Sequence, residues 1–112
     1  MARATDGGIQ AAKAARNQAR WRELNERVRF PAERSGDVEF VCECVGRDCS
    51  ETLRLSVAAY ERIGSSPIRF PIAVGHDSAA VETVVQMCDQ YAVVEKRGKA
   101  AKIAAYFNPR SK

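Results

Sequence analysis

The segment Cys42-Glu-Cys-Val-Gly-Arg-Asp-Cys49 carries three of the four cysteines of this 112-residue chain, in a Cys-x-Cys-x4-Cys spacing. Alternate residues of a strand point to the same side, so Cys42 and Cys44 present two thiols side by side. The loop that contains Gly46 can turn Cys49 back toward them. We predict a zinc ion here, because zinc prefers tetrahedral nitrogen and sulfur ligands and three soft ligands then meet at one point.

A closed zinc site needs a fourth ligand, and the chain contains a single histidine. His76 lies in a Gly-His-Asp loop at the end of a predicted strand and is the favoured ligand. Cys88 is the alternative. It continues the apolar stripe of a predicted helix, as a buried structural cysteine does, and that stripe consists of Val81, Val84 and Val85. About 15 Å of helix would separate the two candidates, so we do not expect both to bind the metal.

Other interpretations of the cysteines are a different metal, three ordinary thiols in a turn, or a Cys42–Cys49 disulfide. A catalytic zinc would need an open coordination position and a nearby general base. Glu43 is the only acid between the first two cysteines, and it faces the opposite side of the strand. No Gly-x-Ser-x-Gly motif or phosphate-cradling glycine loop is present in the sequence. We therefore predict a structural site and no enzymatic activity.

Patterning on both sides of the cysteines predicts an α+β fold with a small, mostly antiparallel sheet. Residues 38–44 and 52–56 alternate as two strands of a zinc-bearing β-hairpin. Residues 9–29 lack proline and glycine and place Trp21, Leu24 and Val28 on one stripe, which predicts an N-terminal amphipathic helix. The other predicted elements are helices over 57–63, 79–87 and 99–107 and strands over 68–74 and 91–95.

Length and composition indicate a chain of about one domain, with 46% hydrophobic residues available for a small core. We expect two parts, an N-terminal basic helix over 1–34 and a zinc-binding α+β domain over 35–112. No apolar run reaches the roughly 18 residues of a membrane span, and the first residues lack the apolar region of a signal peptide. We therefore expect a cytoplasmic protein with no membrane contact, and in a reducing compartment clustered cysteines indicate metal binding.

Charge is distributed unevenly along the chain. The net charge is +4 over residues 1–34, −6 over 35–95 and +6 over 96–112. The basic ends predict contacts with nucleic acid or a ribonucleoprotein. The candidate phosphate-binding residues are Lys13, Arg16, Arg20, Lys96, Arg97, Lys99 and Lys102. The alternatives are a protein-interaction adaptor that uses the Trp21 helix on a partner or a second copy, and a thiolate redox sensor that loses zinc on oxidation.

Four segments together resemble a family of small uncharacterised actinobacterial proteins. These motifs are Phe-x-Cys-Glu-Cys-x4-Cys-x-Glu at 40–51, Leu-x-Leu-x4-Tyr-Glu at 53–61, Phe-x4-Gly-His at 70–76 and Val-Val-Glu-Lys at 93–96. The resemblance runs from about Trp21 to Arg110 and implies metal binding by Cys42, Cys44, Cys49 and His76. It implies no activity. The chain departs from the family in a longer Ala/Arg-rich N-terminus and in Pro71-Ile-Ala-Val74.

Overall fold

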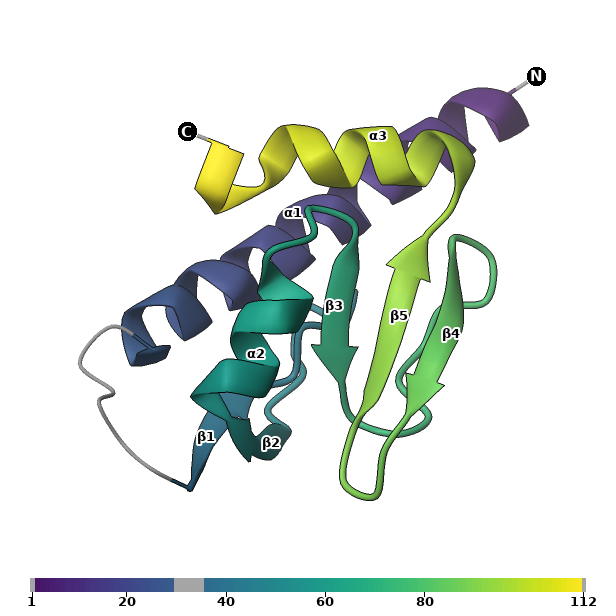
Figure 1. The fold of residues 1–112 in the computed structure, drawn as a ribbon. Coiled ribbons are helices and arrows are strands. Elements are labelled where there is room, and N and C mark those ends of the chain that lie inside the picture. The colour runs from purple at the N-terminus through teal and green to yellow at the C-terminus, as the bar shows by residue number, and fades with distance from the viewer. Residues whose placement is uncertain (1, 30–35, 112) are drawn as a thin grey trace.

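The computed structural model describes residues 2–29 and 36–111, which form an α+β fold with three helices and two small antiparallel sheets (Figure 1). This confirms the predicted fold class. In chain order the elements are α1 (Ala2–Arg29), β1 (Asp37–Val41), β2 (Thr52–Ser56), α2 (Val57–Gly64), β3 (Arg69–Ile72), β4 (Glu82–Met87), β5 (Ala92–Lys96), α3 (Gly98–Phe107) and the 3₁₀ turn η1 (Pro109–Ser111). Within these residues no helix combines the length and apolar character that crossing a membrane requires.

Strands β1 and β2 form the predicted antiparallel hairpin. Their alternation turns one face of each strand inward, and the buried cross-strand pairs are Val38 with Leu55 and Phe40 with Leu53. The Phe40 ring also stacks on Tyr60 of α2, with 4.5 Å between ring centroids. Strand β1 ends at Val41, so the first two cysteines follow the strand and do not belong to it.

The second sheet has the strand order β3-β5-β4, and both pairings are antiparallel. The predicted helix over 79–87 is wrong, because most of this segment is strand β4. A β-bulge interrupts the pairing of β4 with β5 between Val84 and Gln86. The bulge adds one residue and breaks the period of two, so apolar residues at 81, 84, 85 and 88 acquire a spacing that is typical of a helix.

Helix α1 confirms the predicted N-terminal helix, but a different face of it is buried. Gln18, Arg22 and Asn25 are fully buried, whereas Leu24 of the predicted apolar stripe is 38% exposed. The side chain of Val28 lies outside the described residues. These buried polar residues form hydrogen bonds with residues 41–43, so this part of α1 packs against the rest of the fold. The domain boundary expected at residue 34 falls in the segment 30–35, which is also outside the described residues.

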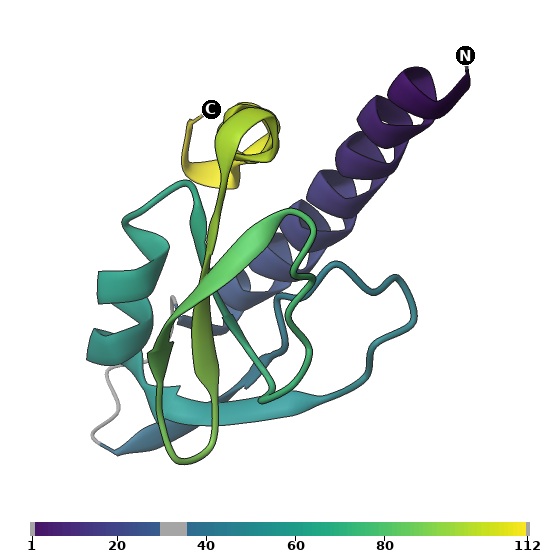
Figure 2. The ribbon, with the colours of Figure 1, turned by 90° about the vertical axis from the view of Figure 1, so that its right-hand side faces the viewer.

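The basic elements at the two ends of the chain pack together. Helix α3 lies across α1 in Figure 1, and the view in Figure 2 shows the N-terminal end of α1 extending beyond the other elements. The guanidinium of Arg16 on α1 lies 5.5 Å from the ring centroid of Phe107 at the end of α3. Basic segments that are far apart in the sequence therefore lie side by side in the fold.

Candidate metal centre

The four predicted ligands converge at one place. The ligand atoms of Cys42, Cys44, Cys49 and His76 all lie within 4.8 Å of one another. His76 Nδ1 lies 3.6 Å from the Sγ atoms of both Cys42 and Cys49. In a tetrahedral zinc site with Zn–S near 2.3 Å and Zn–N near 2.0 Å, the nitrogen–sulfur edge is about 3.5 Å. The cluster is therefore geometrically fit to hold a metal ion.

Backbone hydrogen bonds position the ligands of two chain segments, the one at Cys42 and the one at His76. The Cys42 N–H donates to Glu51 O at 3.0 Å and so extends the hairpin past β1. The His76 N–H donates to Ala73 O at 3.0 Å, in the turn that follows β3. The Ala73 N–H donates to Cys42 Sγ at 3.1 Å, which joins the two segments at the sulfur itself. Such N–H···S bonds stabilise the thiolate form that binds metals.

The thiols of Cys42 and Cys44 are electrostatically linked. A hydrogen bond with Cys42 lowers the pKa of Cys44 to about 5. The same bond, together with burial, raises the pKa of Cys42. A thiolate therefore forms readily in the cluster even while a neighbouring sulfur keeps its proton. Because metal binding replaces such protons, this arrangement favours a cation at the centre.

Cys88 is not part of the cluster. It follows β4 and is half-buried, and its N–H donates to Tyr91 O at 2.9 Å. It therefore lies in a turn between two strands and not on the apolar stripe of a helix. All four cysteines are free, so the Cys42–Cys49 disulfide considered above is not formed. His76 is the fourth residue of the group, as the sequence predicted.

Polar side chains of α1 hold the segment 41–46, which carries two of the cluster cysteines. Sequence reasoning missed these contacts. The contacts are Asn25 Nδ2 to Val41 O (2.9 Å), Val41 N to Asn25 Oδ1 (2.8 Å), Gln18 Nε2 to Glu43 O (3.1 Å), Asn17 Nδ2 to Val45 O (2.9 Å) and Trp21 Nε1 to Gly46 O (3.0 Å). Each pairs a helix side chain with a peptide group of the segment 41–46. The available signal was the spacing of Asn17, Trp21 and Asn25, since residues four apart share one helix face.

Glu43 faces away from the thiols, as predicted, and enters a buried network. Its carboxylate accepts hydrogen bonds from Arg22 Nε (3.0 Å), Asn25 Nδ2 (2.8 Å) and Tyr60 OH (2.7 Å). The Arg22 and Glu43 side chains are both completely buried. Burial, with the Glu43 charge as the second cause, raises the pKa of Tyr60. Glu43 therefore attaches α1 to the domain.

The predicted phosphate-binding residues fall into two groups. Lys13, Arg16, Arg20, Lys99 and Lys102 are exposed on α1 and α3. Lys96 is a correction to the prediction, because it is buried and its Nζ lies 3.0 Å from Glu82 Oε1. Burial lowers the pKa of Lys96, and the Glu82 carboxylate opposes that effect. A lysine that is buried and paired in this way is not available to a phosphate.

Arg97 is exposed but also makes contacts within the chain. Its guanidinium donates to Glu82 O at 3.0 Å and to Thr83 Oγ1 at 2.7 Å, and it also bonds the carbonyl of Ala79. These bonds hold the start of β4 against the end of β5. Arg97 therefore has fewer donors left for a phosphate than the five exposed cations on α1 and α3.

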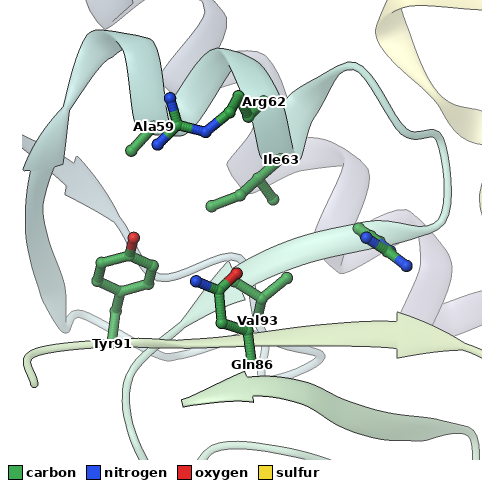
Figure 3. Close-up of a pocket in the computed structure, with 7 residues that line it drawn as sticks. Ala59, Arg62, Ile63, Gln86, Tyr91 and Val93 are labelled. Atoms are coloured by element: carbon green, nitrogen blue, oxygen red, sulfur yellow. The ribbon is translucent and has the colours of Figure 1, made fainter. Parts of the chain in front are cut away.

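A cavity of about 110 Å³ lies between α2 and the β3-β5-β4 sheet (Figure 3). Its lining combines apolar side chains, Ala59, Ile63 and Val93, with the polar side chains Arg62, Arg69, Gln86 and Tyr91. The Arg69 guanidinium already pairs with Glu95 at 2.9 Å. The cavity contains none of the cluster residues.

Searches among protein-family models, curated proteins and solved structures gave no match to this chain. The resemblance to the actinobacterial family therefore stays a prediction from the sequence motifs.

Proposed function

We propose that the chain is a non-enzymatic module that contains a structural zinc ion and binds nucleic acid. Three thiolates and one imidazole form a ligand set that zinc prefers over hard cations such as magnesium and calcium. Cys42, Cys44, Cys49 and His76 would fill all four tetrahedral positions. No position is then left for a substrate or a reactive water, which supports a structural role.

When bound, the ion would supply a cross-link between parts of a small fold. Cys42 and His76 are 34 residues apart in sequence, and their ligand atoms lie 3.6 Å apart. The link would join the hairpin loop to the turn after β3. Because a site of this kind does not exist in the unfolded chain, the free energy of metal binding stabilises the folded state. We therefore expect the metal to order the segment 42–49.

The surface that would bind nucleic acid consists of five exposed cations on two packed helices. Lys13, Arg16, Arg20, Lys99 and Lys102 form no ion pair with a carboxylate in the part of the chain that the structure describes. This is the observation that carries the proposal. Lysine and arginine side chains that neutralise phosphates release counterions, which drives binding without reading a base sequence.

The contacts of Trp21 give little support to the alternative function, a protein-interaction adaptor that uses the Trp21 helix. The indole Nε1 donates to Gly46 O at 3.0 Å, and the side chain is half-buried. This contact favours a role for Trp21 in holding the loop 45–48, between Cys44 and Cys49, over a role as an anchor for a protein partner.

The test is the salt dependence of nucleic-acid binding by the zinc-loaded chain. Fluorescence anisotropy with a short labelled DNA duplex gives the affinity at several salt concentrations. We expect the double variant Lys99→Gln/Lys102→Gln to lower the slope of log affinity against log salt by about two, because each phosphate contact contributes about 0.9. A chain with no affinity at about 50 mM salt, or with affinity that salt does not change, would contradict the proposal and favour the adaptor.

Arg54→Gln is the control for the loss of one positive charge, to be compared with the single variant Lys99→Gln. Arg54 lies on β2, outside both helices, and its contact with Glu39 is a 3.9 Å pair between exposed side chains. Its removal should leave the salt slope unchanged. A control that lowers the slope as much as a helix variant would indicate that net charge alone, and not the α1–α3 surface, governs binding.

A further inference from the structure

The loop that carries the metal ligands also completes a hollow on the surface of α1. The hollow has a volume of about 260 Å³ and is lined by Lys13, Arg16, Asn17, Arg20 and Arg47. Four of these five residues are cationic, and none is acidic. Arg47 comes from the loop between Cys44 and Cys49, so the hollow combines two parts of the chain that sequence reasoning kept separate.

Hydrogen bonds fix the loop against the helix next to this hollow. Asn17 Nδ2 donates to Val45 O at 2.9 Å, and Trp21 Nε1 donates to Gly46 O at 3.0 Å. These two carbonyls directly precede Arg47. On the helix side, Lys13, Arg16 and Arg20 recur at spacings of three and four and so share one face of α1. The backbone that carries each cation is therefore held in place before any ligand arrives.

The cations of the hollow lack strong partners of their own. Lys13, Arg16 and Arg20 form no ion pair with a carboxylate among residues 2–29 and 36–111. Arg47 lies 3.8 Å from Asp48, but both side chains are mostly exposed, and such a pair contributes little. Like charges gathered in one concavity raise the local positive potential, which an anion bound there would offset.

We propose that this hollow binds phosphate groups of a nucleic-acid backbone, with Arg47 of the metal loop and the cations of α1 acting on the same segment of the strand. The inference rests on the nucleic-acid binding proposed above and names its main contact site. Guanidinium groups suit phosphate because their planar donors can bind two oxygens at once. The only side-chain amide in the lining, that of Asn17, donates to Val45 O, so the contacts carry no base preference.

Metal binding by the cluster would restrain Arg47 further. Cys44 and Cys49 flank the four residues 45–48, and both belong to the Cys3His cluster. Zinc binding would fix both ends of this short loop and so limit the positions of Arg47. Arg16 is restrained differently, since its guanidinium lies over the Phe107 ring at 5.5 Å. A bound ion would therefore limit the motion of Arg47 in the hollow in addition to the hydrogen bonds from α1.

Arg47→Gln tests the inference in the zinc-loaded chain, with Arg54→Gln as the matched control. The Arg47 side chain is 77% exposed, so the substitution should not affect folding. We expect Arg47→Gln to reduce the salt slope for a DNA duplex by about 0.9 and the affinity roughly eightfold at about 0.1 M salt. Arg54→Gln should match the wild type. If Arg47→Gln also matches the wild type while the wild type binds DNA, the hollow is not the contact site, and nucleic-acid binding through other cations stands.

A titration with inorganic phosphate separates failure of the site from failure of the proposed function. Backbone amide shifts of residues 13–20 and 45–48 should change in a saturable way in the wild type and much less in Arg47→Gln. If DNA does not bind but these shifts occur, nucleic-acid binding is wrong, and with it the assignment of the hollow to a nucleic-acid backbone. If neither DNA nor phosphate changes the amide shifts of these residues, the hollow does not bind anions, and the inference is wrong.

Discussion

Replacing Glu43 by glutamine tests how α1 is attached to the rest of the fold. The two carboxylate oxygens of Glu43 accept three hydrogen bonds, from Arg22 Nε, Asn25 Nδ2 and Tyr60 OH, at 2.7 to 3.0 Å. A glutamine offers one acceptor oxygen and an amide that donates, so at least one of these donors would face another donor. Arg22 would keep its bonds to the carbonyls of Ser66 and Arg69, but its buried charge would lose its carboxylate.

Removing one partner of a buried ion pair costs about 3–5 kcal/mol. This is a large part of the total of about 5–15 kcal/mol that stabilises a domain of this kind. In urea unfolding of the zinc-loaded chain, followed by circular dichroism, a slope near 2 kcal/mol/M converts the loss into a midpoint about 2 M lower. We therefore expect Glu43→Gln to stay folded only at low urea concentrations.

Glu39→Gln is the matched control, because Glu39 lies on β1 and is exposed. Its only ion pair among the described residues is with Arg54 at 3.9 Å. An exposed pair of this kind contributes less than about 1 kcal/mol to the free energy of unfolding, so the urea midpoint of Glu39→Gln should stay close to that of the wild type. Equal urea midpoints for Glu43→Gln and Glu39→Gln would show that the Glu43 network does not hold α1 in place.

Two further predictions concern the cysteines and Tyr60. His76→Ala should lose zinc to a chelator far faster than Cys88→Ala, because Cys88 lies outside the cluster. In urea unfolding, Cys88→Ala should lower the free energy of unfolding by only about 1 kcal/mol. A loss of zinc by Cys88→Ala but not by His76→Ala would show that the fourth ligand has been assigned wrongly. Because the folded-state pKa of Tyr60 is raised, the unfolded chain loses its phenol proton first, and stability should fall by up to about 1.4 kcal/mol per pH unit above about pH 10. Tyr60→Phe should show a smaller decrease, and an identical dependence of the urea midpoint on pH in both proteins would contradict the prediction.

Local patterns were sufficient to predict the hairpin and the four cluster residues. Val38 and Phe40 alternate with polar residues, and this period of two is set by the strand itself. Cys42 and Cys44 are close in sequence, so their spacing alone brings two ligands together. His76 is distant, but as the only histidine it had no competitor of its own type.

Contacts between distant residues explain what the sequence did not reveal. The buried face of α1 is polar because Gln18, Arg22 and Asn25 meet partners more than 15 residues away, and no hydrophobic pattern marks such a face. Lys96 was assigned to the surface by its charge alone, whereas the structure buries it against Glu82, a residue of the neighbouring strand. In β4 the bulge shifted the apolar residues into a helical spacing, so the pattern itself was misleading.

We propose that one zinc ion, held by Cys42, Cys44, Cys49 and His76, orders the fold. The most direct measurement is elemental analysis of the folded chain purified without added metal. We expect about one equivalent of zinc per chain, and removing that zinc should loosen the fold, because metal binding and folding are coupled in such sites. A well-folded chain that contains less than about a tenth of an equivalent of zinc would contradict this proposal.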